Sequence, residues 1–140
     1  MATIAAQHKR HIVVIEDAPD LAELLKDLLE DEGYQVWTAG DGLAGLALIR
    51  ATHPDIVLCD LGLPGFDGHA VARAVREDPS LAATRLLALS GWTQPQDVAR
   101  ARASGFEVLL PKPLGVDSVI AEVERAGARF DTGLDRAQDA

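Results

Sequence analysis

Residues 56–60, Ile-Val-Leu-Cys-Asp, place four apolar side chains directly before an acidic one, and a turn rich in Gly and Pro follows at 61–65. A short, continuously apolar run with such boundaries is typical of a strand covered on both faces. A carboxylate at its end is costly unless a cation or a hydrogen-bond donor meets it. Asp60 is therefore either a functional group or a turn residue, the commoner role of Asp after a strand.

Similar apolar runs recur along the chain and alternate with amphipathic stretches. The predicted strands occupy residues 11–16, 34–38, 55–59, 85–90 and 107–110. A helix is predicted after each strand; the last one begins near Val116. Five alternating strands and helices predict an α/β fold, in which a five-stranded parallel sheet carries helices on both faces.

Composition and length indicate one globular domain. The 140 residues are 48% hydrophobic, which is enough for an aliphatic core. A formal net charge of −9 argues against nucleic acid as a partner, because phosphates select basic surfaces. No apolar run reaches membrane-spanning length and the N-terminus has no export pattern, so we expect no membrane contact and a cytoplasmic protein. The single cysteine, Cys59, is expected to be a buried hydrophobe.

The helical pattern decays after Arg125, and this sets the expected domain limits. We divide the chain into an N-terminal extension (1–9), one domain (10–126) and a polar C-terminal tail (127–140) that we expect to be frayed. The tail is too short to form an output domain.

Residues that carry chemistry stand at the ends of four predicted strands. They are Glu16 and Asp17 after the first strand, Asp60 after the third, Ser90 after the fourth and Lys112 after the fifth. Each alone has a structural explanation, such as a helix cap or a surface lysine. Chance rarely places all of them at one sheet edge, where parallel α/β sheets bind ligands, so we expect them to form a site.

Three clustered carboxylates repel one another unless a cation lies among them, and oxygen ligands with room for water suit Mg²⁺. A phosphoryl group on Asp60 would then meet Mg²⁺ and Lys112 as positive charges and Ser90 as a hydrogen-bond donor. The set therefore favours a carboxylate nucleophile that forms an aspartyl phosphate.

The order of the motifs resembles the receiver domains of two-component response regulators over residues 10–126. The similar segments are VVIEDAPDLAELL (13–25), DLGLPGFDG (60–68), ALSGW (88–92) and GFEVLLPKP (105–113). The resemblance implies the flavodoxin-like (βα)5 receiver fold. It also implies a phosphoprotein in signal transduction, not an enzyme, that receives its phosphoryl group from a sensor histidine kinase or a histidine phosphotransfer protein. The last two segments are most similar to receivers attached to hybrid sensor kinases.

The resemblance also assigns roles to individual residues. Asp60 would be the phospho-acceptor, Lys112 the phosphate-binding ammonium and Ser90 the switch hydroxyl. Asp17 and Asp60 would bind Mg²⁺ directly, and the remaining two Mg²⁺ contacts would be the backbone carbonyl of Gly62 and Glu16, the latter through water. The output would be a protein contact or onward phosphotransfer in a phosphorelay to an unknown target, rather than DNA binding.

Three positions depart from the family pattern. Leu109 stands where receivers usually carry an aromatic ring that moves inward with the switch hydroxyl. Gly62 has no side chain at a position that influences phosphoryl lifetime in the family. Trp92 is a large ring in the predicted switch region, either close to the phosphoryl site or a half-exposed loop aromatic.

Two alternatives remain open. A Mg²⁺-dependent phosphatase of the haloacid dehalogenase type also uses an aspartyl nucleophile on a parallel sheet, but it normally carries a second acid at the position of Gly62. The other alternative is an interaction module of the same fold that is never phosphorylated; the intact acidic residues and Lys112 argue against it.

Overall fold

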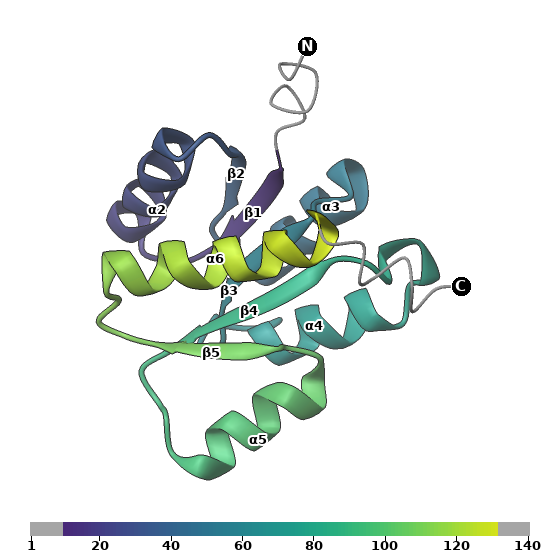
Figure 1. The fold of residues 1–140 in the computed structure, drawn as a ribbon. Coiled ribbons are helices and arrows are strands. Elements are labelled where there is room, and N and C mark those ends of the chain that lie inside the picture. Colours follow the sequence, from purple (N-terminus) through teal and green to yellow (C-terminus); the bar gives the residue numbers. More distant parts are fainter. Residues whose placement is uncertain (1–9, 132–140) are drawn as a thin grey trace.

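The computed structural model describes residues 10–131, and within this range five strands form one parallel sheet in the order β2-β1-β3-β4-β5 (Figure 1). The strands are β1 (His11–Ile15), β2 (Gln35–Ala39), β3 (Ile56–Asp60), β4 (Arg85–Ser90) and β5 (Val108–Pro111). The helices are α2 (Pro19–Asp31), α3 (Gly42–Thr52), α4 (Gly68–Arg76), the short η1 (Pro79–Leu81), α5 (Pro95–Ser104) and α6 (Val116–Asp131). The α/β fold with a five-stranded parallel sheet is confirmed.

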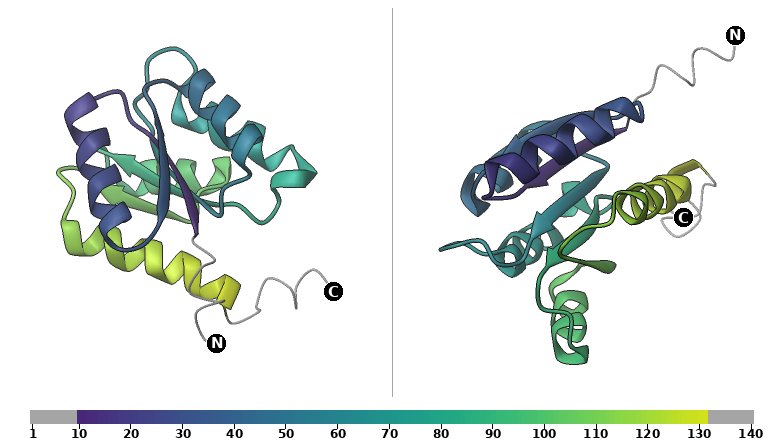
Figure 2. Two further views of the ribbon diagram at one scale, coloured as in Figure 1. Left: turned by 90° about the horizontal axis from the view of Figure 1, so that it is seen from above. Right: turned by 90° about the vertical axis from the view of Figure 1, so that its left-hand side faces the viewer.

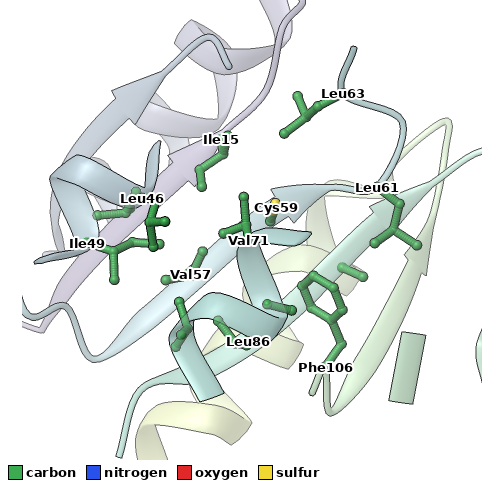
Figure 3. Packing of buried hydrophobic residues seen from close by; sticks show 14 of the residues in the cluster. Ile15, Leu46, Ile49, Val57, Cys59, Leu61, Leu63, Val71, Leu86 and Phe106 are labelled. Atoms are coloured by element: carbon green, nitrogen blue, oxygen red, sulfur yellow. The ribbon is translucent and has the colours of Figure 1, made fainter. Parts of the chain in front are cut away.

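Helices cover both faces of the sheet, as Figure 2 shows. Helices α2 and α6 pack on one face, where Leu25 and Val119 belong to the same buried cluster as Ile12 and Leu58. Helices α3, α4 and α5 pack on the other face around a second cluster (Figure 3). Cys59 lies in that second cluster with no exposed surface, as expected for a small buried hydrophobe.

The chain changes direction across the sheet between β2 and β3. Strand β2 lies on one side of β1, and β3, β4 and β5 follow in order on the other side. The carboxyl ends of β1 and β3 therefore form the switch point at which open α/β sheets bind ligands. All five residues of β3 are buried, so Asp60 ends a strand in the middle of the molecule.

Helix α6 continues to Asp131, beyond residue 126, where the sequence pattern ends the expected domain. Ala126 is buried, and the Phe130 ring lies 4.9 Å from the guanidinium carbon of Arg10 and 5.7 Å from that of Arg85. These cation–π contacts explain why the helix persists through residues 127–131. The remainder of the expected tail (132–140) and the N-terminal extension (1–9) lie outside the described residues. Within residues 10–131, no helix is both long and apolar enough to cross a bilayer.

Candidate phosphorylation site

The three acidic residues at the switch point come together. Glu16 and Asp17 directly follow β1, and Asp60 ends β3; each offers a carboxylate oxygen, and these oxygens lie within 4.8 Å of one another. Glu16 is 1% exposed and Asp60 is 7% exposed, whereas Asp17 is open to solvent. The cluster therefore joins two buried carboxylates to one that faces the solvent.

Lys112 compensates part of this negative charge. Its Nζ lies 2.8 Å from Glu16 Oε1 and 3.1 Å from Asp60 Oδ2. Burial alone would lower the pKa of the Lys112 ammonium, but the hydrogen bonds and charges of Glu16 and Asp60 raise it above its usual value. The lysine is therefore a fixed cation that bridges the ends of β1 and β3.

The Glu16 carboxylate is held by the chain around it. Its Oε2 accepts a hydrogen bond from the Ala18 backbone N–H at 3.1 Å. Burial nevertheless raises the pKa of the Glu16 carboxyl, because desolvation, with a smaller effect of the Asp60 charge, opposes the charged form more than Lys112 and Ala18 favour it. The site as it stands holds more negative charge than its protein contacts neutralise.

This imbalance fits a divalent cation. When ionised, the three carboxylates carry a charge of −3 and Lys112 offsets +1, so two negative charges remain. Carboxylate oxygens that cluster at an edge open to water on the Asp17 side are the donor set that Mg²⁺ prefers. The residues present therefore fit the expected Mg²⁺.

The Asp60 side chain is oriented by the turn that follows it. Its Oδ1 accepts a hydrogen bond from the Gly62 N–H at 2.9 Å, which leaves Oδ2 to Lys112. Gly68, at the start of α4, lies against the backbone of the same residue: an added Cβ would stand 2.5 Å from the Asp60 carbonyl oxygen. Sequence reasoning missed this role of Gly68, because the sequence does not reveal a close approach of two backbone segments. The metal contact expected for the Gly62 carbonyl stays a prediction.

Ser90 closes a tight turn at the end of β4. Its Oγ accepts a hydrogen bond from the Trp92 N–H at 2.9 Å and donates one to the Trp92 carbonyl at 3.0 Å. The Ser90 carbonyl in turn accepts from the Lys112 N–H at 2.8 Å. Ser90 is 2% exposed and follows Leu89, the residue of β4 paired with Asp60. The Ser90 hydroxyl, expected from the sequence to be the switch, thus lies one residue beyond the neighbour of Asp60, with its hydrogen bonds satisfied inside its own turn.

The Trp92 indole lies beside the turn that follows Asp60. It is 68% exposed, and its Cζ3 atom would be 3.5 Å from a Cβ added at Gly62, a point that is 3.6 Å from Asp60 Oδ1. Leu109, by contrast, is half-buried in β5, pairs with Ala88 and packs against the core cluster on the α3–α5 face. The two departures thus lie in different surroundings: Trp92 beside Asp60 and in solvent, Leu109 already packed.

Comparisons with known proteins agree with this geometry. The family described as the response regulator receiver domain matches residues 12–124. The DNA-binding dual master transcriptional regulator RpaA of Synechocystis is 36% identical over 120 residues, 86% of this chain and 50% of RpaA. The polar-differentiation response regulator DivK of Brucella ovis is 30% identical over 115 residues, 82% of this chain and 94% of DivK. The chain spans about half the length of the first of these relatives.

A solved structure shows the same architecture. The crystal structure of a putative response regulator from Chloroflexus aurantiacus matches with a TM-score of 0.81 at 27% sequence identity, and the match covers 86% of this chain and 99% of that one. The flavodoxin-like receiver fold is thereby confirmed. With the family match over nearly the whole described range, the chain belongs to the response regulator receiver domains of two-component signalling.

Proposed function

We propose that this protein accepts a phosphoryl group on Asp60 from a phosphohistidine, with Mg²⁺ bound, and passes a signal on through a protein contact or onward phosphotransfer. The observation that carries the proposal is the environment of the Asp60 carboxylate. It ends the central strand, belongs to an acidic cluster that fits a divalent cation, and lies 3.1 Å from the ammonium of Lys112. The donor would be a sensor histidine kinase or a histidine phosphotransfer protein, and the cytoplasm is the proposed location.

The transfer exchanges one bond to phosphorus for another. An oxygen of Asp60 attacks the phosphorus, the bond from phosphorus to the imidazole nitrogen breaks, and the imidazole leaves with the bonding electrons. Lys112 balances charge that moves onto the phosphoryl oxygens, and the Gly62 N–H keeps the carboxylate oriented. Asp17, Asp60 and the Gly62 carbonyl would hold Mg²⁺, with Glu16 acting through water, and the ion would supply further charge neutralisation there.

Ser90 supplies the response to this step. Its hydroxyl proton is used in the bond to the Trp92 carbonyl, so binding a phosphoryl oxygen requires that bond to be given up. The loop after β4 therefore changes when Asp60 is modified. Signalling rather than turnover of small phosphate esters is the expected output, because the position two residues after Asp60, the acid position of the phosphatase alternative, is Gly62.

An apolar groove supports a docking position for the donor. It runs between α2 and the start of α6, and its lining includes Leu21, Leu24, Lys112, Leu114 and Val116. Leu24 is 55% exposed and Val116 is 47% exposed. Because Lys112 both lines the groove and reaches Asp60, an apolar helix of the donor seated there would bring its histidine close to the acceptor. Leu24→Ser should then slow transfer from a phosphohistidine donor but leave labelling by acetyl phosphate unchanged.

Labelling with a small phosphodonor tests the proposal directly. Acetyl phosphate should label the protein when Mg²⁺ is present and should fail after chelation. Asp60→Asn should remove the label, because an amide is a far poorer nucleophile than a carboxylate. Asp67→Asn is the matched control, since Asp67 is a nearby acid whose side chain caps α4. Labelling that persists in Asp60→Asn, or without metal, would contradict the assignment; unlabelled wild type would support the non-phosphorylated module.

A further inference from the structure

Helix α5 is anchored unequally at its two ends. Its buried residues are Ala101 and Ser104, both in its C-terminal half, and Phe106 just beyond the helix is 3% exposed. Residues 91–96, which form the preceding loop and the first two positions of the helix, are all exposed. The core therefore holds the C-terminal end of α5, while the N-terminal end follows the loop that begins at Ser90.

A buried hydrogen bond fixes the C-terminal end to α4. The Nδ1 atom of His69 lies 2.7 Å from Ser104 Oγ, and both side chains are 5% exposed. Ser104 donates its single hydroxyl proton to the Arg100 carbonyl at 3.0 Å, so in this bond His69 is the donor, through its Nδ1–H. The His69 ring also stands edge-on to Phe106, with ring centres 6.5 Å apart. One side chain of α4 thus contacts both the last residue of α5 and the segment after it.

His69 is itself tied to the centre of the molecule. It follows Gly68, whose missing side chain allows α4 to lie directly on the backbone of Asp60 and Leu61. Two backbone segments packed this closely leave no space for one to shift alone. The C-terminal end of α5 is therefore connected, through His69 and Gly68, to the most buried strand of the sheet.

The other end of α5 has space in which to move. A cavity lies beside its first turns, and its lining includes Leu61, His69, Ser90, Trp92, Asp97 and Arg100. The Ser90 turn that joins this end to β4 is the turn that must change if the hydroxyl binds a phosphoryl oxygen. Strand β5 carries no aromatic ring and Leu109 is already packed, so no ring of β5 shares in that change.

We propose that the His69–Ser104 hydrogen bond is the pivot of α5: it holds the C-terminal end in place while the N-terminal end moves with Ser90. The proposal rests on the proposed phosphorylation of Asp60 and describes how that modification would change the position of α5. His69 is a positioning residue in this scheme, since it acts through Ser104.

Hydrogen exchange of the unmodified protein tests the anchor by itself. Ser104→Ala removes the acceptor, and His69→Phe keeps a ring against Phe106 but removes the donor. Each should lower the protection of amides 101–106 by roughly three- to tenfold, the worth of one hydrogen bond. The double variant should lose no more than Ser104→Ala alone, because the bond that His69→Phe removes is already absent there; Ser104→Ala also removes the bond to the Arg100 carbonyl. Thr52→Ala is the matched control: Thr52 donates to the Leu48 carbonyl four residues earlier, as Ser104 does to Arg100, and should leave amides 101–106 unchanged.

The response to beryllofluoride with Mg²⁺ tests the pivot. In the wild type, amide shift changes should gather in residues 90–98 and be small in 101–106. In Ser104→Ala they should spread over 101–106 as well, whereas in Thr52→Ala the wild-type distribution should persist. Equal changes at both ends of wild-type α5, or a distribution that Ser104→Ala leaves unaltered, would overturn the pivot.

The two arms separate failure of the pivot from failure of the proposed function. If the wild type neither responds to beryllofluoride nor accepts label on Asp60, the proposed function is wrong. Protection of 101–106 that is unchanged in Ser104→Ala overturns the pivot whatever happens at Asp60.

Discussion

The two sides of the candidate site differ in how firmly they are held. At the ends of β1 and β3, Glu16 and Asp60 are buried and both contact Lys112. At the end of β4, Ser90 bonds within its own turn and Trp92 is 68% exposed. We call the ends of β1 and β3 the fixed side, because its groups are held in place as transfer of a phosphoryl group requires. We call the end of β4 with its following loop the responding side, because it has the few core contacts that a segment able to move requires.

The topology of the sheet explains this difference. Strand β3 lies in the middle of the sheet and is buried along its whole length, so groups at its end are oriented by a packed core. Strand β5 is an edge strand with one buried residue, Leu110, and α5 beside it has two buried residues. The buried carboxylates thus follow the inner strands β1 and β3, and Lys112 reaches them from the end of the edge strand β5, whereas the loop after β4 leads to the weakly anchored α5.

The largest effect is expected from Lys112→Met, which removes the cation of the fixed side. Labelling of Asp60 by acetyl phosphate should fall roughly hundredfold, because a lost charge partner of the transferred group typically costs that much in rate. Lys26→Met serves as the control, since Lys26 pairs with Glu30 in an exposed part of α2. The rate of labelling by mass spectrometry measures both. A fall of less than threefold in Lys112→Met would show that the fixed side does not depend on this cation.

Substitutions at Gly68 and Gly62 compare the two sides by their effect on the free energy of unfolding. Gly68→Ala forces a Cβ to within 2.5 Å of the Asp60 carbonyl oxygen, where backbone must move, and should cost ~3 kcal/mol in the free energy of unfolding. Gly62→Ala places its Cβ at ordinary contact distance, 3.5 Å from Trp92, and should cost less than about 1 kcal/mol. Urea unfolding compares the two. Equal losses would mean that the turn after Asp60 is held no more firmly at α4 than at Trp92.

The sequence predicted the fixed side better than the responding side, and the reason is physical. An apolar run that ends in an acid, as at Asp60, indicates both a buried strand and the edge at which its last residue lies. The parallel topology then places Glu16, Asp17 and Lys112 at that same edge. The pairing of His69 with Ser104 has no such signal, because a lone histidine in a helix fits no pattern. Helix α6 likewise outlasts its apolar stripe, because Arg10 and Arg85, both distant in sequence, contact Phe130.

Fluorescence provides a smaller but direct view of the responding side. Beryllofluoride with Mg²⁺ should change the tryptophan emission, and Trp92→Phe should remove most of that change, because Trp92 lies beside the turn that follows Asp60. Trp37→Phe should retain it: Trp37 is half-buried in β2, edge-on to His11. If Trp37→Phe removes the change instead, the response reaches the far edge of the sheet and the division between the two sides fails.

The smallest effect concerns His69, which joins the two sides. Burial, followed by the charge of Arg100, lowers the pKa of this imidazole; Asp67 opposes this with a smaller effect, and Arg73 adds the smallest contribution. The unfolded chain therefore binds a proton at His69 more tightly than the folded protein does. By linkage, the free energy of unfolding falls as the pH drops below the unfolded pKa of 6.5, and the loss is complete below the lower, folded pKa.

Urea unfolding at pH 7.5 and pH 5.5 measures this contribution. The wild type should lose more stability between the two pH values than His69→Phe does, by an amount small beside the ~3 kcal/mol expected for Gly68→Ala. The carboxyl groups titrate in both proteins, so their part cancels in the difference. The Ser104→Ala variant should keep the wild-type pH dependence, because its imidazole stays buried beside Arg100. An identical pH dependence in wild type and His69→Phe would show that water reaches the His69 side chain and that its contact with Ser104 is not buried in solution.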